Sequence, residues 1–343
     1  MTTLITGGGG YIGSRIAERL DDVILWTHSR VAPPASAARL RAIAGEITSN
    51  DPFRDVPTTI KRIIHAAAVT RFNVDPDTAR AVNVEGTRKL LEFAKRCEQL
   101  ESIDLLSTVY AVGLRDGVIA EEPCDGADGF ANEYERSKCC AERILMSDFA
   151  NLPWRIERIA TVIADDDDGR VTQQNAVHNT LKLLYYGLMS LVPGKPEVPL
   201  YFVTASFVAD AVCAAIEKGP LQAIYHVCHT REESITLGEF IDTVFATFEA
   251  DPKFRSRRAL KPIYTDSESF ELMVKQVSNF SGGILGQAVG SVAPFARELF
   301  SEKEFRNDRM LSVAPHLRAP NPKQLVANVC QNLIDSRFGM AKT

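Results

Sequence analysis

The sequence predicts an α/β fold, in which a doubly wound parallel sheet carries a second, smaller and mainly helical lobe. Short apolar runs typical of buried strands alternate with segments of helical periodicity through the first half of the chain. The first of these runs leads directly into a glycine-rich turn and a helix. The 343 residues are enough for one large α/β unit with an elaborated second lobe, or for two domains.

Composition narrows the classes of function. With 45% hydrophobic residues, 24% charged residues and a net charge of −5, the chain has no general attraction for nucleic acid or anionic membranes. No apolar run approaches membrane-spanning length, and the first strand starts at residue 2, so we expect a cytoplasmic protein with no signal peptide and no membrane span. The seven cysteines are scattered and lack zinc spacing, so we expect free thiols and no metal site.

The first strand, residues 2–5, is followed by a turn with spaced glycines. Gly7 can adopt the positive φ of the turn, Gly10 has no Cβ to keep a pyrophosphate away, and Gly13 allows the next helix to pack closely on the strand. The N-terminus of that helix then faces the anion with free N–H groups. This pattern predicts a dinucleotide site of the Rossmann type, with contacts from Gly7, Gly10, Tyr11, Ile12 and Gly13.

The residues after the second strand indicate which nicotinamide coenzyme binds. A site for NAD usually has a carboxylate here, which accepts hydrogen bonds from ribose hydroxyls and repels a 2′-phosphate. The strand at residues 23–26 is instead followed by Thr27, His28, Ser29 and Arg30. Because a guanidinium and a hydroxyl can hold a phosphate, we expect His28, Ser29 and Arg30 to contact the coenzyme, and NADP to be preferred over NAD.

Three more strands and a long helix follow. The third strand ends near residues 44–47, beside the expected adenine, and the fourth spans residues 60–65. Residues 77–99 have the periodicity of a long helix, and residues 103–108 form a fifth strand. Small side chains after the fourth strand leave room for the coenzyme at the carboxyl edge of the sheet, where open α/β sheets bind ligands. The expected contacts here are Glu46, Ile47, Ala66, Ala67 and Ala68.

A tyrosine and a lysine stand four residues apart in a later helical segment. At that spacing Tyr134 and Lys138 project from the same helix face, one turn apart. A phenol with a pKa of about 10 is a poor acid–base catalyst at neutral pH, and a neighbouring ammonium lowers that pKa by favouring the phenolate. The fifth strand ends in two hydroxyls, Ser107 and Thr108, so we expect these four side chains to form the catalytic group.

Together these motifs resemble the extended short-chain dehydrogenase/reductase superfamily over about the first two-thirds of the chain. Within that superfamily, residues 130–142 look most like the branch of thioester reductases and fatty acyl-CoA reductases. The resemblance rests on the glycine turn, the alanines after the fourth strand, Asn83, Ser107 and Thr108 followed by Gly113, and Tyr134 with Lys138.

The resemblance implies a role for each matched residue. Tyr134 would be the general acid/base, Lys138 would bind the nicotinamide ribose and lower the pKa of the tyrosine, and Thr108 would hydrogen-bond the substrate oxygen, with Ser107 nearby. We select Thr108 because its distance to Gly113 fits the serine-to-glycine spacing of the sugar epimerases in this superfamily. The implied coenzyme contacts in this part of the chain are Asn83, Lys138, Ile159 and Thr161.

The resemblance also implies that a second lobe is assembled after the sixth strand and from the C-terminus. The acidic run at residues 165–168 is expected to be a solvated loop, because like charges repel. Residues 181–192 are apolar nearly all round, which indicates a helix that packs in a core or lines an acyl channel, with core packing favoured. The expected division is an NADP-binding core at 1–164, to which 199–230 return, and a substrate lobe at 165–198 and 231–343.

The leading hypothesis is an NADP-dependent reductase of a carbonyl or an acyl thioester. In it Tyr134 protonates the developing oxyanion and Thr108 holds that oxygen in place. Two other hypotheses remain: a nucleotide-sugar epimerase or dehydratase with bound NAD, and a non-catalytic NADP-binding protein. The sequence leaves open whether the chain forms a homodimer.

A basic cluster stands out in the otherwise acidic C-terminal third. Its interpretation is either a solvated loop, which is favoured, or a docking site for an acidic acyl carrier protein or for the phosphates of coenzyme A. The cluster consists of Lys253, Arg255, Arg257, Arg258 and Lys261.

Overall fold

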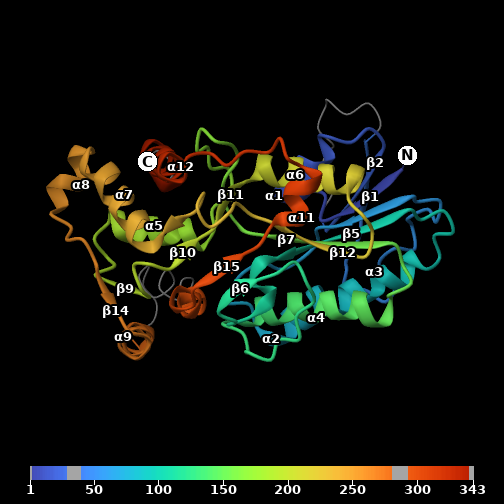
Figure 1. Ribbon diagram of the computed structural model, residues 1–343, viewed down its shortest axis with the longest axis horizontal. Coiled ribbons are helices and arrows are strands. Elements are labelled where there is room, and N and C mark those ends of the chain that lie inside the picture. The colour runs from blue at the N-terminus through green and yellow to red at the C-terminus, as the bar shows by residue number, and fades with distance from the viewer. Residues whose placement is uncertain (1, 29–39, 280–292, 340–343) are drawn as a thin grey trace.

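Seven parallel strands form the sheet on which the molecule is built (Figure 1). The computed structural model describes residues 2–28, 40–279 and 293–339. The strand order is β12-β7-β5-β4-β1-β2-β3, so the direction of winding reverses beside β1. The predicted doubly wound parallel sheet is therefore confirmed. The strands are β1 (Thr3–Thr6), β2 (Val23–Thr27), β3 (Leu40–Ala44), β4 (Arg62–His65), β5 (Ser102–Thr108), β7 (Trp154–Ile159) and β12 (Ala223–Val227).

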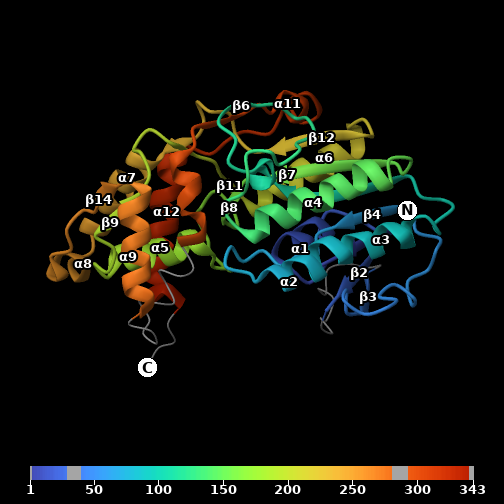
Figure 2. The same cartoon turned by 90° about the horizontal axis from the view of Figure 1, so that it is seen from below.

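Helices cover both faces of this sheet because successive strand residues point to opposite faces. Leu4 belongs to the apolar cluster that includes Leu90 and Leu145, whereas Ile5 belongs to the cluster that includes Ile16. In Figures 1 and 2, α3 and α4 accordingly lie on one side of the sheet, and α1 and α6 on the other. These helices are α1 (Tyr11–Ala17), α3 (Gly86–Ala94), α4 (Glu133–Asp148) and α6 (Ala205–Lys218), with α11 (Asp308–Val313) packed on α6.

The long helix predicted for residues 77–99 is divided into three parts. A short helix α2 (Pro76–Ala79) begins after Asp75, whose carboxylate accepts a hydrogen bond of 2.9 Å from the Thr78 N–H. A π-helical turn η1 (Arg80–Glu85) follows, and α3 ends at Ala94, earlier than predicted. Because π-turns inside helices are often found at functional sites, η1 suggests that residues 80–85 lie near the functional site.

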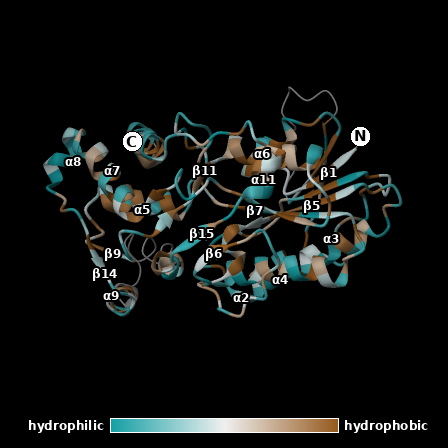
Figure 3. Ribbon diagram, viewed as in Figure 1, coloured by the Kyte–Doolittle hydropathy of each residue, from teal (hydrophilic) through white to brown (hydrophobic). Residues whose placement is uncertain are grey.

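The second lobe is mainly helical and has its own apolar core, separate from the clusters on the sheet. Figure 3 shows apolar residues concentrated on α5 and on the strands of the sheet, and hydrophilic residues over α8. No described helix is long and apolar enough to cross a membrane. The lobe contains α5 (Ala176–Tyr185), α7 (Leu237–Glu249), α8 (Pro252–Arg257), α9 (Ser267–Asn279), η3 (Ala293–Phe300), α12 (Pro322–Asp335) and η4 (Arg337–Gly339).

Short strand pairs connect the lobe to the sheet and stabilise its loops. The parallel pairs are β8 (Thr161–Ala164) with β11 (Phe202–Thr204), β9 (Leu191–Pro193) with β14 (Ile263–Thr265), and β6 (Gly117–Ile119) with β15 (Lys303–Phe305). The antiparallel pair is β10 (Pro199–Leu200) with β13 (Ile235–Thr236). Because β6 and β15 are far apart in sequence, the C-terminal part of the chain returns to the segment that precedes α4.

The apolar segment 181–192 is a helix only in its first part. α5 starts earlier, where Asn175 and His178 form a capping box, and it ends at Tyr185. Gly187 then adopts a φ of 66°, and the chain continues into the strand β9. The helical prediction is therefore wrong beyond residue 185, because a left-handed glycine ends the helix and the chain then pairs with β14.

Candidate active site

The glycine turn lies against the end of β4. Gly7 has a φ of 68°, and a Cβ at this position would be 2.7 Å from the backbone N of Ala67. A Cβ at Gly13 would be 2.5 Å from the carbonyl oxygen of Gly7, so α1 packs directly on the turn. The predicted glycines and alanines therefore meet at the carboxyl edge of the sheet, where β1 lies between β2 and β4. We name this place the glycine crevice, after Gly7, Gly10, Gly13, Ala66, Ala67 and Ala68.

The residue after β2 has an acidic neighbour. The imidazole Nε2 of His28 is 2.6 Å from a carboxylate oxygen of Glu46, and both side chains are exposed. They meet because β2 and β3 are adjacent parallel strands, with Thr27 opposite Ala44. The segment that follows β2 has no acidic residue, and the carboxylate beside its end comes from the segment after β3. The predicted contacts Ser29 and Arg30 lie outside the described residues, and Ile47 packs as a buried residue under α3.

Three of the predicted catalytic side chains come together. Thr108 is the last residue of β5, and Tyr134 lies in the first turn of α4, where the Thr108 hydroxyl is near enough to act on the pKa of the phenol. The ammonium of Lys138 lies one turn further along, is almost fully buried, and donates a hydrogen bond of 2.7 Å to the carbonyl oxygen of Leu106. Asn132 caps the helix by accepting 3.0 Å from the N–H of Glu135, which sets where α4 begins.

Burial sets the protonation of this group. Burial raises the pKa of Tyr134 to about 12 and Glu135 raises it further, while the nearby hydroxyl of Thr108 works in the opposite direction. Tyr134 therefore keeps its proton at neutral pH. Burial also lowers the pKa of Lys138 to about 8, against the attraction of Glu142. The ammonium of Lys138 donates to a β5 carbonyl, and its effect on the phenol pKa stays a prediction.

Ser107 contacts a later turn of α4 than Thr108 does. Its hydroxyl donates a short hydrogen bond to the carboxylate of Glu142, and that carboxylate forms an ion pair of 2.7 Å with Arg158. Both charged side chains are completely buried. Since neighbouring residues of a strand point to opposite faces, Ser107 does not share the position of Thr108. The catalytic role of Ser107 stays a prediction, while its contact in the structure supports Glu142. Sequence reasoning did not assign Glu142 or Arg158.

Asn83 links two parts of the chain. It lies in the π-turn η1 and is 1% exposed. Its amide oxygen accepts 2.8 Å from the N–H of Val69, and its amide nitrogen donates 3.0 Å to the Val69 carbonyl and 2.9 Å to the hydroxyl of Ser137. Asn83 thus joins the loop after β4 to α4, and its contact with a coenzyme stays a prediction.

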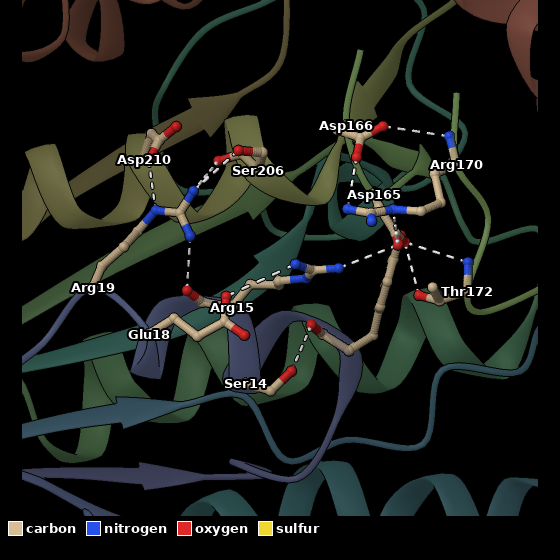
Figure 4. A network of polar contacts seen from close by, with 11 residues as sticks. Ser14, Arg15, Glu18, Arg19, Asp165, Asp166, Arg170, Thr172, Ser206 and Asp210 are labelled. Carbon is tan, nitrogen blue, oxygen red and sulfur yellow. Dashed lines mark hydrogen bonds and ion pairs between the residues drawn. The ribbon is translucent and has the colours of Figure 1, made fainter. Parts of the chain in front are cut away.

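Tyr11 leads from the glycine crevice to the second lobe. Its hydroxyl donates to the carboxylate of Asp165, which also accepts 2.8 Å from the hydroxyl of Thr172 and 3.2 Å from the guanidinium of Arg15. Arg170 forms an ion pair of 3.3 Å with the same carboxylate (Figure 4). Burial opposes the charge, but these donors hold the pKa of Asp165 below its usual value.

The prediction of a solvated acidic loop is therefore wrong for its first residue. Asp165 is 2% exposed, because it extends from β8 toward α1 rather than into solvent. Asp166 partly follows the same direction, since it pairs at 2.8 Å with Arg170. The network of Figure 4 thus connects the helix of the glycine crevice with the segment that leads to α5.

An apolar pocket opens beside the catalytic cluster. The ring of Phe72 lies 5.8 Å from that of Tyr134 and stacks at 5.1 Å on Phe295, which also contacts Tyr110. The hydroxyl of Thr161 is 3.1 Å from that of Tyr110, which places this predicted contact in the wall of the pocket, whereas Ile159 is buried in the core. The cavity volume is about 70 Å³. It is lined by residues of both lobes, among them Val177, Thr180, Met189, Val192, Phe202, Phe240, Ile241 and Leu299.

The favoured interpretation of segment 181–192, core packing, is confirmed. Leu181, Leu183 and Leu184 pack in the core of the second lobe, together with Met189 and Val192. Met189 and Val192 also line the pocket. A role as an acyl channel stays a prediction.

Two residues of the basic cluster contact side chains of the chain itself. The guanidinium of Arg257 lies 4.8 Å from the ring of Tyr185 and 4.9 Å from that of Tyr186. Lys261 forms an ion pair with Asp242. In the part of the chain that the structure describes, no group of three or more histidine, cysteine and carboxylate side chains has the arrangement of a metal site.

The comparison with protein families shows the family of this chain. Residues 6–212, more than half of the chain, match the family model described as male sterility protein. The chain belongs to this family of extended short-chain dehydrogenases/reductases. The matched region includes the glycine crevice, Thr108, Tyr134 and Lys138. The family consists of NAD(P)-dependent reductases and dehydrogenases.

Curated relatives match only part of their own length. Fatty acyl-CoA reductase 2, chloroplastic, of Arabidopsis thaliana is 36% identical over 83 residues, which are 24% of this chain and 14% of that protein. Probable fatty acyl-CoA reductase 5 of the same plant is 21% identical over 252 residues, which are 57% of this chain and 51% of that protein. The chain thus spans about half or less of the length of these two relatives.

Two solved structures resemble the whole chain. The terminal R domain from the myxalamid PKS-NRPS biosynthetic pathway has a TM-score of 0.79 and 19% identity, covering 98% of this chain and 91% of its own. A thiolation-reductase di-domain from an archaeal non-ribosomal peptide synthetase has a TM-score of 0.71 and 17% identity, covering 99% of this chain and 76% of its own. At these identities the likeness establishes the fold, including the second lobe.

Proposed function

We propose that this chain is an NADP-dependent reductase that acts on an acyl thioester, or on a related carbonyl compound, with an apolar substituent. One arrangement carries the proposal: Thr108 at the end of β5 and Tyr134 in the first turn of α4 stand next to the apolar pocket, through the contact of Tyr134 with Phe72. The pair also lies at the carboxyl edge of β5, which neighbours β4 and the glycine crevice. A reacting carbon placed at this pair can meet a coenzyme on one side and an apolar chain on the other.

The residues of the glycine crevice fit a nicotinamide dinucleotide. The turn carries no side chain at Gly7, Gly8, Gly9 and Gly10, so its backbone is open to a close approach by a pyrophosphate. The ammonium of Lys138 has three N–H bonds and donates one to Leu106, which leaves donors for ribose hydroxyls. A bound coenzyme supplies the hydride.

The chain supplies the proton and the position of the oxygen. Tyr134 holds its proton at neutral pH, so it can donate to the oxyanion that develops on a reduced carbonyl. Thr108 directs its hydroxyl to the same oxygen and orients it. From a thioester the first reduction yields a hemithioacetal, which collapses to an aldehyde and a free thiol. The apolar pocket excludes water around this step.

We propose that NADP is preferred over NAD, because a histidine, a serine and an arginine follow β2. The contact of His28 with Glu46 influences this preference. The Glu46 carboxylate would repel a 2′-phosphate, while His28 offsets its charge when protonated. The measurement is the ratio of kcat/KM for NADPH and NADH in the His28→Gln variant. A ratio lower than that of the unmodified protein supports this role, and an unchanged ratio contradicts it.

The partner proposed for the basic cluster is an acyl carrier protein or the phosphates of coenzyme A. Support comes from the exposed positions of Lys253, Arg255 and Arg258 on α8 and directly after it, and from the name of the thiolation-reductase di-domain with the same fold. Because Arg257 packs on two tyrosine rings, its reversal would also disturb the lobe. The paired change Lys253→Glu with Arg258→Glu should raise the KM for a carrier-bound substrate and spare a small thioester. Lys95→Glu, directly after the distant helix α3, is the control. Equal effects on both substrates would contradict docking.

The function is tested by NADPH oxidation with acyl-CoA, carrier-bound acyl groups, aldehydes and ketones, with products identified by mass. Net consumption of NADPH separates a reductase from an epimerase, which returns the hydride, and from a protein that only binds the coenzyme. The variant Tyr134→Phe should lower kcat by about 10²–10⁴-fold, the usual contribution of a general acid. Tyr110→Phe is the matched control, since this neighbouring hydroxyl contacts Thr161 and not Thr108. Equal activity of the Tyr134→Phe variant and the unmodified protein would refute the mechanism.

A further inference from the structure

Two cysteines meet next to the catalytic helix face. The sulfur of Cys124, in the irregular segment between β6 and α4, lies 3.7 Å from the sulfur of Cys139. Cys139 follows Lys138 directly in α4 and is 1% exposed. Cys124 is only partly buried, so it is the more exposed of the two cysteines. The two thiols thus differ in access while they touch each other.

A buried cation faces one of the two sulfurs. The guanidinium Nη2 of Arg158 is 3.4 Å from the sulfur of Cys124. The Cys124 thiol also donates a hydrogen bond of 3.3 Å to the carbonyl oxygen of Ala111. At longer range the carboxylates of Glu142 and Asp125 oppose a negative charge on the Cys124 sulfur. The contact with the Cys139 thiol lowers the pKa of Cys124 most, and Arg158 adds to this, whereas the pKa of Cys139 is raised. Of the two cysteines, Cys124 is therefore the one that more readily forms a thiolate.

We propose that Cys124 and Cys139 are a redox modification site, in which a hydroperoxide oxidises Cys124 and Cys139 resolves it into a reversible disulfide. In the first step the Cys124 thiolate attacks the peroxide, an S–O bond forms, the O–O bond breaks, and an alcohol or water leaves. In the second step the Cys139 sulfur attacks the sulfenic acid, the S–S bond forms, the S–O bond breaks, and the hydroxyl leaves as water with the Cys139 proton. Two thiols and one hydroperoxide thus give one disulfide, one alcohol or water, and one water.

The site is built so that one partner moves. A disulfide has an S–S length of about 2.05 Å, so the sulfurs must approach each other from their present contact. Cys139 is buried on a long helix, whereas Cys124 lies in a segment without regular structure. The segment that moves also supplies the carbonyl oxygen of Glu122, which accepts 3.0 Å from Arg158. Oxidation therefore shifts the segment that contacts Arg158, and with it the ion pair of Arg158 and Glu142. It also constrains α4, the helix that carries Lys138.

The test treats the whole, reduced protein with hydrogen peroxide, then counts thiols after unfolding and maps peptides by mass. We expect loss of two of the seven thiols, a cross-linked peptide pair that joins Cys124 to Cys139, and full recovery with dithiothreitol. Cys140 shares a tryptic peptide with Cys139, so Cys140→Ser is the matched control and should keep the cross-link. Cys139→Ser should leave a sulfenic acid on Cys124 that dimedone traps. A cross-link that survives Cys124→Ser, or no cross-link in the unmodified protein, would overturn the site.

A second measurement concerns activity and rests on the proposed function. Turnover of NADPH should fall on oxidation and return with dithiothreitol, while the Cys124→Ser protein stays unaffected by the same treatment. Unchanged turnover in a protein that is fully cross-linked by mass would refute control of the active site. A protein that lacks NADPH turnover when reduced would instead count against the proposed function, and the thiol count and peptide map decide the disulfide in either case.

Discussion

Replacing Glu142 by Gln removes the charge that balances Arg158 in the interior of the protein. The two side chains are fully buried, and the guanidinium of Arg158 contacts the carboxylate through Nε at 3.1 and 3.2 Å and through Nη2 at 2.7 Å. Glutamine has almost the same volume, so the change adds no cavity. The loss then comes from the uncompensated cation and from the weaker acceptor for Ser107.

The expected cost is about 3–5 kcal/mol, the range for breaking one partner of a buried ion pair. The assay is equilibrium unfolding in guanidinium, followed by the fluorescence of Trp154, which begins the strand β7 that also carries Arg158. The double variant Glu142→Leu with Arg158→Met should recover most of the loss, because a pair of apolar residues of similar volume often replaces a buried ion pair at little cost.

Two results would refute this reasoning. One is a loss below about 1 kcal/mol for Glu142→Gln, the size expected of an exposed ion pair. The other is a double variant that is as unstable as the single one, which would mean that Ser107 and the carbonyl of Glu122 dominate through their own hydrogen bonds.

Three further predictions concern protonation and the coenzyme. With the Lys138 pKa at about 8, kcat for reduction should fall as pH rises through that value, and Lys138→Arg should move the limb to higher pH. Glu46→Gln should raise the kcat/KM ratio of NADPH over NADH, because it removes a carboxylate from the contact with His28. Asp165→Asn should cost about 1–3 kcal/mol of stability at pH 7 in urea unfolding, and far less at a pH where the native carboxyl is already protonated.

The sign of the Asp165 effect follows from its lowered pKa. The carboxylate contributes stability above its unfolded pKa of about 3.9, and this is lost as pH falls through the lower folded value. An equal cost at both pH values would contradict the assignment. For Lys138 the control is Glu135→Gln, since burial raises the pKa of Glu135 to about 8 as well. If the fall of kcat with rising pH disappears in the Glu135→Gln variant, the titrating group is Glu135 and not Lys138. For Glu46 the opposing result is an unchanged coenzyme ratio.

Much of the fold could be predicted from the sequence because its signals are local. Strands and helices leave periods of two and 3.6 residues in the chain, and the glycine turn and the spacing of Tyr134 and Lys138 are read within a few residues. The order of these motifs along the chain was enough to predict the sheet. Element ends were less predictable: the π-turn around Asn83 and the left-handed Gly187 depend on what packs against them.

The sequence by itself determined the parallel sheet, the glycine crevice and the candidate group of Thr108, Tyr134 and Lys138. Only the tertiary structure decided which way the charged side chains point. Asp165 binds Tyr11 from 154 residues away, and Glu142 forms an ion pair with Arg158. Desolvation of an ionisable group and the partners that offset it are properties of the packed interior, and no spacing along the chain records them.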